Sequence, residues 1–220
     1  MTLEFKKRIT TSVILLILLI FMYFYLYILI ISLIIIALIS WIEFYGLISK
    51  IFYKDKNKDE VLRFVFKSLS LIYLSLLVFG ILYVVSNKPD LKIFFVYSIF
   101  VAIASDIGGI TFGKFFKGKR LTKISPRKTI SGSIGSFSFS FLLIPFFIEF
   151  FINHEILFLF MITATISFTT QLGDLFISFM KRKAKVKDTS DLLPGHGGVL
   201  DRIDGIIFAL PIGFLLLNYF

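Results

Sequence analysis

Long apolar runs, separated by short polar segments, extend along the whole chain. A helix needs about 20 apolar residues to cross roughly 30 Å of hydrocarbon. On that criterion the runs predict about seven transmembrane helices, at about 9–26, 28–48, 66–86, 92–113, 133–152, 156–179 and 203–220. The first two helices share one continuous run, and we place the turn between them at the aromatic cluster Tyr23–Tyr27, since aromatic side chains favour the membrane interface. The expected fold class is an all-α polytopic integral membrane protein, with residues 1–220 as one membrane-embedded domain.

Basic residues fall almost entirely on one side of this seven-helix arrangement. Of the 24 Lys and Arg, only Lys88 and Lys92 lie on the other side. Cytoplasmic loops carry an excess of Lys and Arg, so the N-terminus and the three basic loops are predicted to be cytosolic. Any chemistry is then expected at the cytosolic face of the cell inner (cytoplasmic) membrane, because the longest polar segments are two of these loops.

Composition agrees with a membrane protein and excludes several classes. The 220 residues are 57% hydrophobic, with a mean hydropathy of +0.92, and a soluble domain of this size could not bury so much apolar surface. The net charge is +10. In a membrane protein such an excess of Lys and Arg reflects the topology and attraction to anionic headgroups, so we expect no nucleic acid as partner. Cysteine is absent, which excludes disulfides and thiolate chemistry. No internal repeat is visible, which weakens a transporter interpretation.

Two carboxylates are predicted at membrane depth, where an unpaired charge costs several kcal/mol and function is the default hypothesis. Asp106 shares a helical face with the small residues Ala102, Gly109 and Gly113, which would let a backbone or ligand approach closely. Asp174 shares a face with Gln171, Ser178 and Lys181, a stripe typical of a cavity wall. The alternative is an aspartate near a helix end that reaches interfacial water.

A second pair of carboxylates lies in the stretch LDRIDG. Asp201 and Asp204 are three residues apart, so at the start of a helix both would point the same way. Two converging carboxylates suit Mg²⁺, with substrate phosphates completing its shell. Carboxylates in a first helical turn also complement the helix dipole, and the spacing alone does not choose between the two interpretations.

Two turns are candidate phosphate-binding elements. Ser125-Pro126-Arg127-Lys128-Thr129 comes just before the expected start of a helix, where free N–H groups and cations bind phosphate. The turn PGHGG, residues 194–198, has a backbone able to present N–H groups to an anion, and His196 at its centre could contact a phosphate or a metal. A solvated loop in which His196 is structural would look similar.

Together, the carboxylates, a candidate metal pair and the basic turns favour nucleotidyl or phosphoryl transfer to a lipid. No Ser–His–Asp pattern, zinc-ligand cluster or Walker-type loop is present in the sequence.

The segment SFMKRKAKVKDTSDLLPGHGGVLDRID, Ser178–Asp204, resembles the signature of the phosphatidate cytidylyltransferase family, also called CDP-diacylglycerol synthase. Further likeness lies upstream. Asp106 with Gly109 and Phe112-Gly113 is similar to the family's D-[ST]-G-A-x-x-x-G helix. Residues 124–129, ISPRKT, resemble its I-S-P-x-K-T turn, and Trp41-x-Glu43 its W-E-W-like segment.

Three features depart from the family pattern. Ser131 stands where the family usually has glutamate, and Ile107 replaces the usual Ser or Thr. The chain is also short for the family, which predicts that some N-terminal spans are missing.

The resemblance implies transfer of the cytidylyl group of CTP to phosphatidic acid, giving CDP-diacylglycerol and pyrophosphate with Mg²⁺, and it leaves a second cation and a homodimer as options. Metal or metal-bound phosphates are implied for Asp174, Asp201 and Asp204. The catalytic residues implied are these three with Lys187 and Asp188. The substrate-binding residues implied are Asp106, Ser125, Arg127, Lys128, Thr129, Lys181, Arg182, His196, Gly197, Gly198 and Arg202. CTP is expected from the cytosol, and acyl chains from the surrounding membrane lipids.

The alternatives are a related CTP-dependent lipid kinase, an ether-lipid cytidylyltransferase, an ion channel or carrier using the membrane carboxylates, and an inactive scaffold that has lost the glutamate at Ser131.

Overall fold

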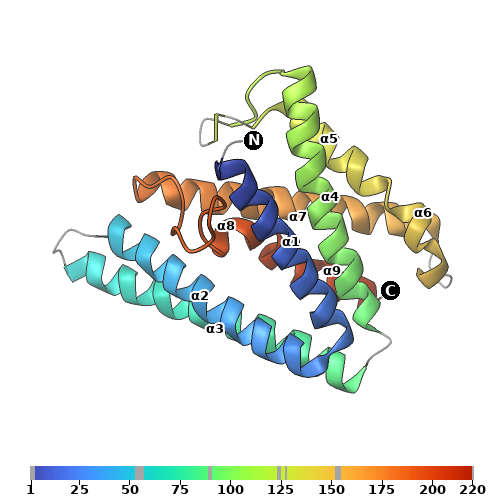
Figure 1. The fold of residues 1–220 in the computed structure, drawn as a ribbon, viewed down its shortest axis with the longest axis horizontal. Coiled ribbons are helices and arrows are strands. Elements are labelled where there is room, and N and C mark those ends of the chain that lie inside the picture. The colour runs from blue at the N-terminus through green and yellow to red at the C-terminus, as the bar shows by residue number, and fades with distance from the viewer. Residues whose placement is uncertain are drawn as a thin grey trace. The chain divides into compact units, whose positions relative to one another are not determined.

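The computed structural model describes residues 3–52, 57–88, 91–122, 125–126, 128–151 and 155–219. Over these ranges the ordered elements are helices, and pairing between extended residues is confined to isolated bridges. Figure 1 labels the elements in chain order. Their bounds are α1 Leu3–Phe24, α2 Leu26–Ile51, α3 Asn57–Asn87, α4 Lys92–Phe116, α5 Ile130–Phe141, α6 Ile144–Phe147, the 3₁₀ helix η2 Ile148–Phe151, α7 Ile156–Lys183, α8 Leu200–Ile203 and α9 Ile206–Tyr219.

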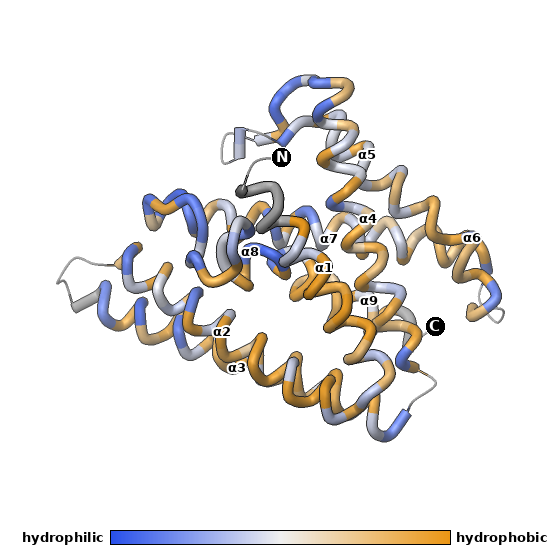
Figure 2. Tube along the Cα trace, in the orientation of Figure 1, coloured by the Kyte–Doolittle hydropathy of each residue, from blue (hydrophilic) through white to orange (hydrophobic). Residues whose placement is uncertain are grey.

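The fold is that of an all-helical, multi-pass membrane protein. In the described ranges, five segments are long and apolar enough to cross a membrane by length and composition: Leu26–Ile51, Asp59–Asn87, Lys92–Phe116, Ile130–Phe151 and Ile156–Lys183. Apolar residues dominate their length in Figure 2. The predicted first span corresponds to the shorter apolar segment Ile9–Phe24, and the predicted last span to α9, which has 14 residues. The number of seven spans and their orientation stay predictions.

The predicted break between the first two helices is confirmed. Tyr25 alone separates α1 from α2, and its backbone is extended (φ −117°, ψ 110°). The predicted helix over 133–152 is less regular than expected, because α5 ends at Phe141 and a new turn begins with Pro145 in its first positions. Proline has no N–H to donate to the carbonyl four residues earlier, here that of Phe141.

The chain forms two compact units, and α3 and α7 contribute to both. The first unit comprises Met1–Leu82 and Met180–Ile203, and the second Tyr83–Phe179 and Asp204–Phe220. In the first unit, α2 and α3 lie side by side (Figure 1). There the indole Nε1 of Trp41 donates to the carbonyl of Lys67 at 3.2 Å, and the rings of Phe52 and Phe66 stack with centroids 5.7 Å apart.

In the second unit, glycines bring α4 and α5 into close backbone contact. A Cβ added to Gly108 would lie 2.2 Å from the carbonyl oxygen of Gly135, and one added to Gly135 would lie 2.4 Å from Cβ of Phe112. Gly109 faces Ser136 in the same way, at 2.8 Å. The predicted close approach to the small-residue face of α4 is therefore confirmed, and what approaches it is a neighbouring helix. Small residues serve this purpose in membrane helices, where dispersion contacts drive association.

Hydroxyl groups tie the helices of the second unit together. Ser105 Oγ lies 3.0 Å from Ser167 Oγ of α7, and its carbonyl accepts from Ser136 Oγ of α5 at 2.7 Å. Ser133 Oγ donates to Gln171 Oε1 at 2.6 Å. Such interhelical bonds are worth about 0.6 kcal/mol each on average in membranes, so their number matters more than any single one.

We expect Gly135→Val to lower the unfolding temperature in detergent, with a loss of about 1–3 kcal/mol, because overpacking forces the backbones of α4 and α5 apart. Gly80→Ala is the matched control, since an added Cβ there meets nothing within 4 Å. The proposed packing is wrong if both variants unfold at the wild-type temperature.

Candidate functional site

A buried glutamate on α2 holds the polar segment that connects α7 to α8, residues 184–199, which we call the connecting loop. Glu43 is 6% exposed. Its Oε1 accepts from Ser190 Oγ at 2.6 Å and from the N–H of Val199 at 3.0 Å. Its Oε2 accepts from Thr189 Oγ1 and from the N–H of Leu200, both at 2.8 Å. One carboxylate thus ties both ends of the turn-rich half of the loop to α2.

Asp201, at the start of α8, holds the loop from the other side. Its Oδ1 pairs with Lys181 Nζ at the end of α7. Its Oδ2 accepts from the N–H of Thr189 at 2.8 Å and from the N–H of Gly198 at 3.0 Å. The Thr189 hydroxyl lies 2.9 Å from the same oxygen and 2.8 Å from Glu43 Oε2, and its single hydrogen is shared between the two carboxylates. The side chain of Asp201 is 3% exposed, so a buried ion pair and two backbone hydrogen bonds converge on it.

These contacts set the pKa of the Asp201 carboxyl below its usual value. Burial on its own would raise this pKa. The hydrogen bond from Lys181, the backbone N–H groups of Thr189 and Gly198 and the Lys181 charge lower it, and together they outweigh the burial. Asp201 is therefore an anion throughout the physiological pH range.

The glycine turn, residues 193–197, closes on itself. The N–H of Leu193 donates to Gly197 O and that of His196 to Leu193 O, both at 2.8 Å. Gly195 and Gly197 have positive φ angles of 77° and 81°, which glycine adopts without strain. Gly197 also has no room for a side chain, because an added Cβ would lie 3.0 Å from Asp201 Oδ2 and 3.2 Å from Cβ of Asp188.

The glycine turn also contacts α1 and Arg202. Thr11 Oγ1 donates to the carbonyl of Pro194 at 3.1 Å, and Ser12 Oγ lies 3.4 Å from His196 Nε2. Arg202 donates from Nε and Nη2 to the carbonyl of His196, at 3.0 and 2.6 Å. The first unit therefore gathers Lys181, Asp188, His196, Gly197, Gly198, Asp201 and Arg202 of the predicted site around the loop. Arg182 and Lys187 are exposed.

In the second unit, Asp174 of α7 forms an ion pair with Lys128 and accepts from Ser178 Oγ at 3.3 Å. The side chains of Lys128 and Asp174 are 23% and 31% exposed. The amide Nε2 of Gln171, one turn earlier on the same helix, is buried without a hydrogen-bond partner. The predicted polar stripe on α7 is thus bonded in part to the basic turn before α5.

That turn has the predicted form. Leu121 N donates to Lys128 O and Ile130 N to Lys119 O, at 2.8 and 3.0 Å. Thr129 caps α5, its hydroxyl accepting from the N–H of Gly132 at 3.0 Å. Ser125 accepts from the N–H of Lys128 at 3.0 Å. Arg127, another predicted phosphate ligand, lies outside the described residues.

The remaining predicted carboxylates, Asp106 and Asp204, differ in burial. Asp106 is on the exposed side of α4. Asp204 is 7% exposed, and its Oδ1 accepts from the N–H of Gly205 at 2.9 Å. Its carbonyl lies against Gly173, the residue before Asp174, at 2.6 Å from the position of an added Cβ.

Asp201 and Asp174 differ in how open each carboxylate is to a divalent cation. Lys181 and the N–H groups of Thr189 and Gly198 already bond to the two oxygens of Asp201, so a cation could bind only if Lys181 or Thr189 moved away. Asp174 is more open, since it pairs with Lys128 and accepts one long hydrogen bond from Ser178. Over the part of the chain that the structure describes, no three His, Asp or Glu side chains lie close enough together to hold a metal ion.

Glu43 was not among the site residues predicted from the sequence. Two signals in the sequence pointed to it. Glu43 is a carboxylate within an apolar span, so the criterion that selected Asp106 and Asp174 would also have selected it. It is also part of the Trp41-x-Glu43 likeness. Its partners lie 146–157 residues further along the chain, and no local pattern indicates such a distant pairing.

Comparison with known proteins places the chain in a family. The family model described as "Cytidylyltransferase family" matches residues 2–220. This chain therefore belongs to the cytidylyltransferase family, as the signature over Ser178–Asp204 predicted.

Several relatives carry the name phosphatidate cytidylyltransferase. The chain is 37% identical to the Staphylococcus haemolyticus protein over 166 residues, which cover 74% of this chain and 62% of that one. It is 45% identical to the Rickettsia bellii protein over 123 residues, 53% and 52% of the two chains, and 34% identical to a Staphylococcus aureus protein over 168 residues, 74% and 62%. The chain therefore spans about half to three fifths of the length of these relatives.

We expect Glu43→Gln to destabilise the connecting loop by about 3 kcal/mol, because an amide NH₂ would replace one oxygen that now accepts buried donors. Trypsin should then cut faster after the exposed Lys187. Glu149→Gln, the same change at an exposed glutamate, should leave the cleavage rate unchanged. Equal cleavage of wild type and Glu43→Gln would contradict the role given to Glu43.

We also expect a pH signature from Asp201. Because its folded pKa lies below the usual 3.8, its contribution to stability is complete above the unfolded pKa and is lost as pH falls through the folded value. The stability difference between wild type and Asp201→Asn should stay constant from about pH 7 to about pH 5 and shrink below about pH 4. Thermal unfolding in detergent measures it, and a difference that already shrinks between pH 7 and 5 would refute the assignment.

Proposed function

We propose that this chain transfers the cytidylyl group of CTP to phosphatidic acid, giving CDP-diacylglycerol and pyrophosphate. The observation that carries the proposal is the identity of 34–45% to relatives named phosphatidate cytidylyltransferase, within a family whose model matches residues 2–220. A phosphate oxygen of phosphatidate attacks the α-phosphorus of CTP, and the bond from that phosphorus to the β-phosphate oxygen breaks. Pyrophosphate leaves with the electron pair.

This reaction suits the chemistry of the described residues. The nucleophile is already anionic, so no strong general base is needed, and catalysis consists of positioning and of stabilising charge at phosphorus and on the leaving group. The connecting loop and the helix ends beside it offer cations for the second task, since Lys187 of the loop, Arg182 of α7 and Arg202 of α8 are exposed. Lys181 is already paired with Asp201, so we propose that its main role is to position the connecting loop.

The residues of the second unit are proposed to act on phosphate as well. Lys128, exposed in part, and the hydroxyls of Ser125 and Thr129 belong to a closed basic turn before α5. Thr129 is occupied as a helix cap, so we expect Lys128 to be the main phosphate ligand of the turn. Asp106 keeps the role that the family resemblance gives it, near the lipid headgroup.

Mg²⁺ is proposed as the cation that accompanies CTP. When bound, it would neutralise the phosphates and stabilise the leaving pyrophosphate. Asp174 is the carboxylate best able to hold it, because it is partly exposed and has fewer partners than Asp201. A second cation and a homodimer remain proposals from the family resemblance.

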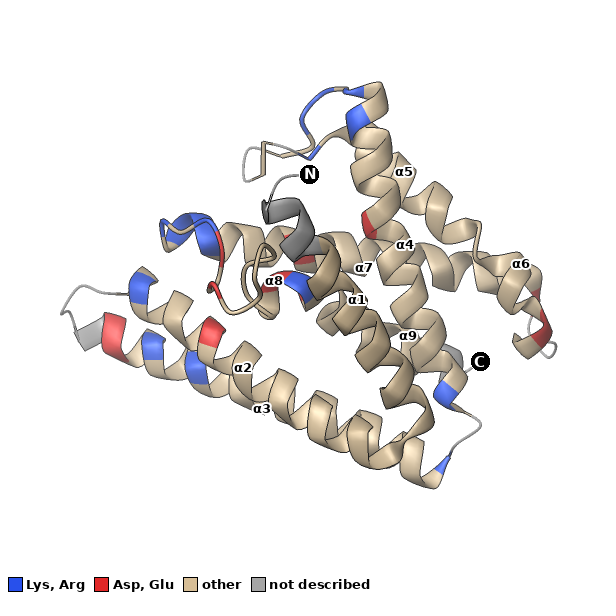
Figure 3. Cartoon of the chain, viewed as in Figure 1, with Lys and Arg blue, Asp and Glu red and all other residues tan. Residues whose placement is uncertain are grey.

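We further propose seven transmembrane helices with the N-terminus and the connecting loop in the cytosol of the cell inner membrane. The strong asymmetry of Lys and Arg supports this orientation. Figure 3 shows the charged residues of α2 and α3 gathered mostly toward the Ile51 end of α2 and the Asn57 end of α3, as expected of two helices whose connecting segment leaves the membrane.

The test uses CTP labelled separately at the α- and γ-phosphates, with purified protein, phosphatidate and Mg²⁺ in detergent. We expect α-label in the lipid and γ-label in pyrophosphate. A CTP-dependent lipid kinase would place the γ-label in the lipid, and an inactive scaffold would release neither label. Flux through protein-only liposomes without CTP would favour a channel or carrier.

Lys187→Gln should reduce turnover by about tenfold or more, since a charge-assisted hydrogen bond to phosphate is worth about 1.5–3 kcal/mol. Lys183→Gln, the same change at an exposed lysine of α7 outside the K-D motif, should retain turnover. Equal rates in the two variants would remove Lys187 from the proposed set.

A further inference from the structure

A groove between α2 and α3, outside the predicted site, combines two cations with aromatic and apolar side chains. It encloses about 450 Å³ and is lined by Trp41, Tyr45, Glu60, Arg63, Phe64, Lys67, Ser68 and Leu71. This volume is within the range of small-molecule sites. All of its residues belong to the first unit. Trp41 is part of the Trp41-x-Glu43 likeness, but the proposed reaction gives no role to any residue of the groove.

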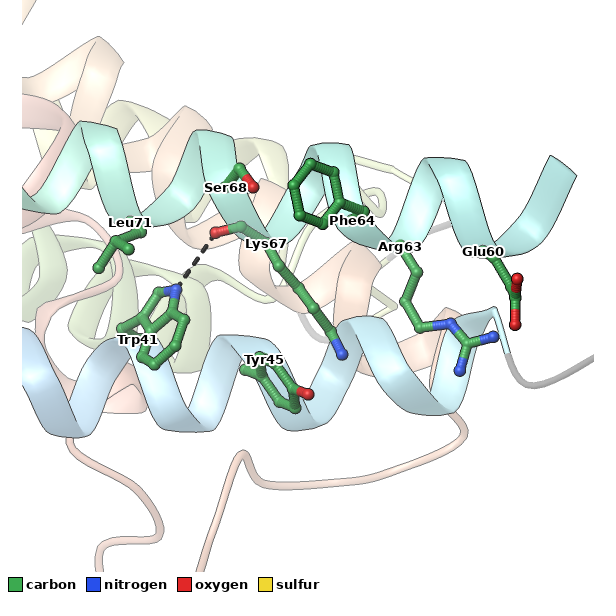
Figure 4. Close-up of a pocket in the computed structure, with 8 residues that line it drawn as sticks. All are labelled: Trp41, Tyr45, Glu60, Arg63, Phe64, Lys67, Ser68 and Leu71. Atoms are coloured by element: carbon green, nitrogen blue, oxygen red, sulfur yellow. Dashed lines mark hydrogen bonds between the residues drawn. The ribbon is translucent and has the colours of Figure 1, made fainter. Parts of the chain in front are cut away.

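The two cations lie on one face of α3. Arg63 and Lys67 are four residues apart, so they are separated by about 6 Å along the helix axis. Lys67 Nζ lies 3.2 Å from the centroid of the Tyr45 ring, which holds the ammonium by a cation–π contact. Figure 4 shows both side chains reaching into the space between α2 and α3.

Arg63 supplies the observation that points to a ligand. Its Nε is buried without a hydrogen-bond partner among the described residues. A buried donor left unsatisfied costs about 1–3 kcal/mol, more when it is charged, so an acceptor bound in the groove would remove a cost that the protein otherwise carries. An oxyanion beside Arg63 and Lys67 would meet both cations.

The groove changes character along its length, and this identifies the class of ligand. In Figure 4, Glu60 and Arg63 lie at one end and Trp41 and Leu71 at the other. Arg63 and Leu71 are eight residues apart, or about 12 Å. The apolar end continues onto side chains that face outward from the helices, with Leu38 51% exposed, Ile42 62% and Leu71 41%. A charged head with attached acyl chains matches this gradient, whereas a free phosphate or nucleotide would leave the apolar end unused.

The net charge of the groove indicates which kind of lipid headgroup it would bind. Arg63, Lys67 and Glu60 sum to one positive charge, which a single-charged phosphodiester neutralises. We propose that the α2–α3 groove binds the phosphodiester headgroup of an anionic phospholipid between Arg63 and Lys67, with its acyl chains along Leu71 and the outward faces of the two helices. Trp41, fixed by its bond to Lys67 O, lies at the level where the headgroup meets the chains, as tryptophan does at membrane interfaces.

The chain carries its own reporter for a test, because Trp41 is the only tryptophan. Detergent-solubilised protein without CTP is titrated with phosphatidylglycerol or phosphatidylcholine that carries brominated acyl chains, and the quenching of Trp41 fluorescence is measured. We expect half-quenching by the anionic lipid at about fivefold lower mole fraction than by the zwitterionic lipid. The proposal is overturned if the two lipids quench the wild-type protein equally.

Variants locate the effect. Arg63→Gln and Lys67→Gln should each remove most of the preference for the anionic lipid. Lys50→Gln, at an exposed position in the last turn of α2 outside the groove, should retain it, and equal losses in all three would show only a general surface charge effect. Inorganic phosphate and CTP should not restore the fluorescence. If either does, the groove is a site for soluble phosphates and the lipid assignment is wrong.

Discussion

The arrangement of the first unit depends on the need to satisfy buried backbone donors with carboxylate oxygens. Within the connecting loop only the glycine turn closes on itself, and α8 has only four residues. Both oxygens of Glu43 and Oδ2 of Asp201 accept from N–H groups and hydroxyls at residues 189, 190 and 198–200. Charge-assisted bonds of this kind are about twice as strong as neutral ones, and a buried carboxylate that lost them would carry a large desolvation cost.

This division of labour separates the charges that shape the loop from those free to meet a substrate. Lys181 and Asp201 neutralise each other in a buried pair. Arg182 and Lys187 stay exposed. Arg202 is exposed as well but also donates to the carbonyl of His196 in the glycine turn. A loop held rigidly by Glu43 and Asp201 can present cations at fixed positions without rearranging during the reaction, which is the main advantage of a preorganised site.

The sequence predicted much of the fold, because helix length, aromatic interfaces and capping are local properties. The break at Tyr25, the start of α5 after Thr129 and the close packing of Gly109 follow from such properties. The interruption at Pro145 was missed because the surrounding run is uniformly apolar. Of the site, the loop and its cations were recognised from the motif. The hydrogen bonds of Glu43 and those that occupy Asp201 were not recognised, since both depend on contacts between distant segments. The groove at Arg63 and Lys67 appeared in the sequence as an ordinary basic loop.

The long sequence separation of Glu43 from its partners has a consequence for biosynthesis. A growing chain inserts α2 well before residues 189–200 exist, since Leu200 follows Glu43 by 157 positions. At synthesis rates of about 5–20 residues per second, the carboxylate waits on the order of ten seconds for its partners. During that time the nascent helix holds a charged group in an apolar span without those hydrogen bonds, which costs a few kcal/mol. The strongly apolar remainder of α2 offsets this cost, so the hydrophobicity of the helix around Glu43 serves membrane insertion as much as the finished fold.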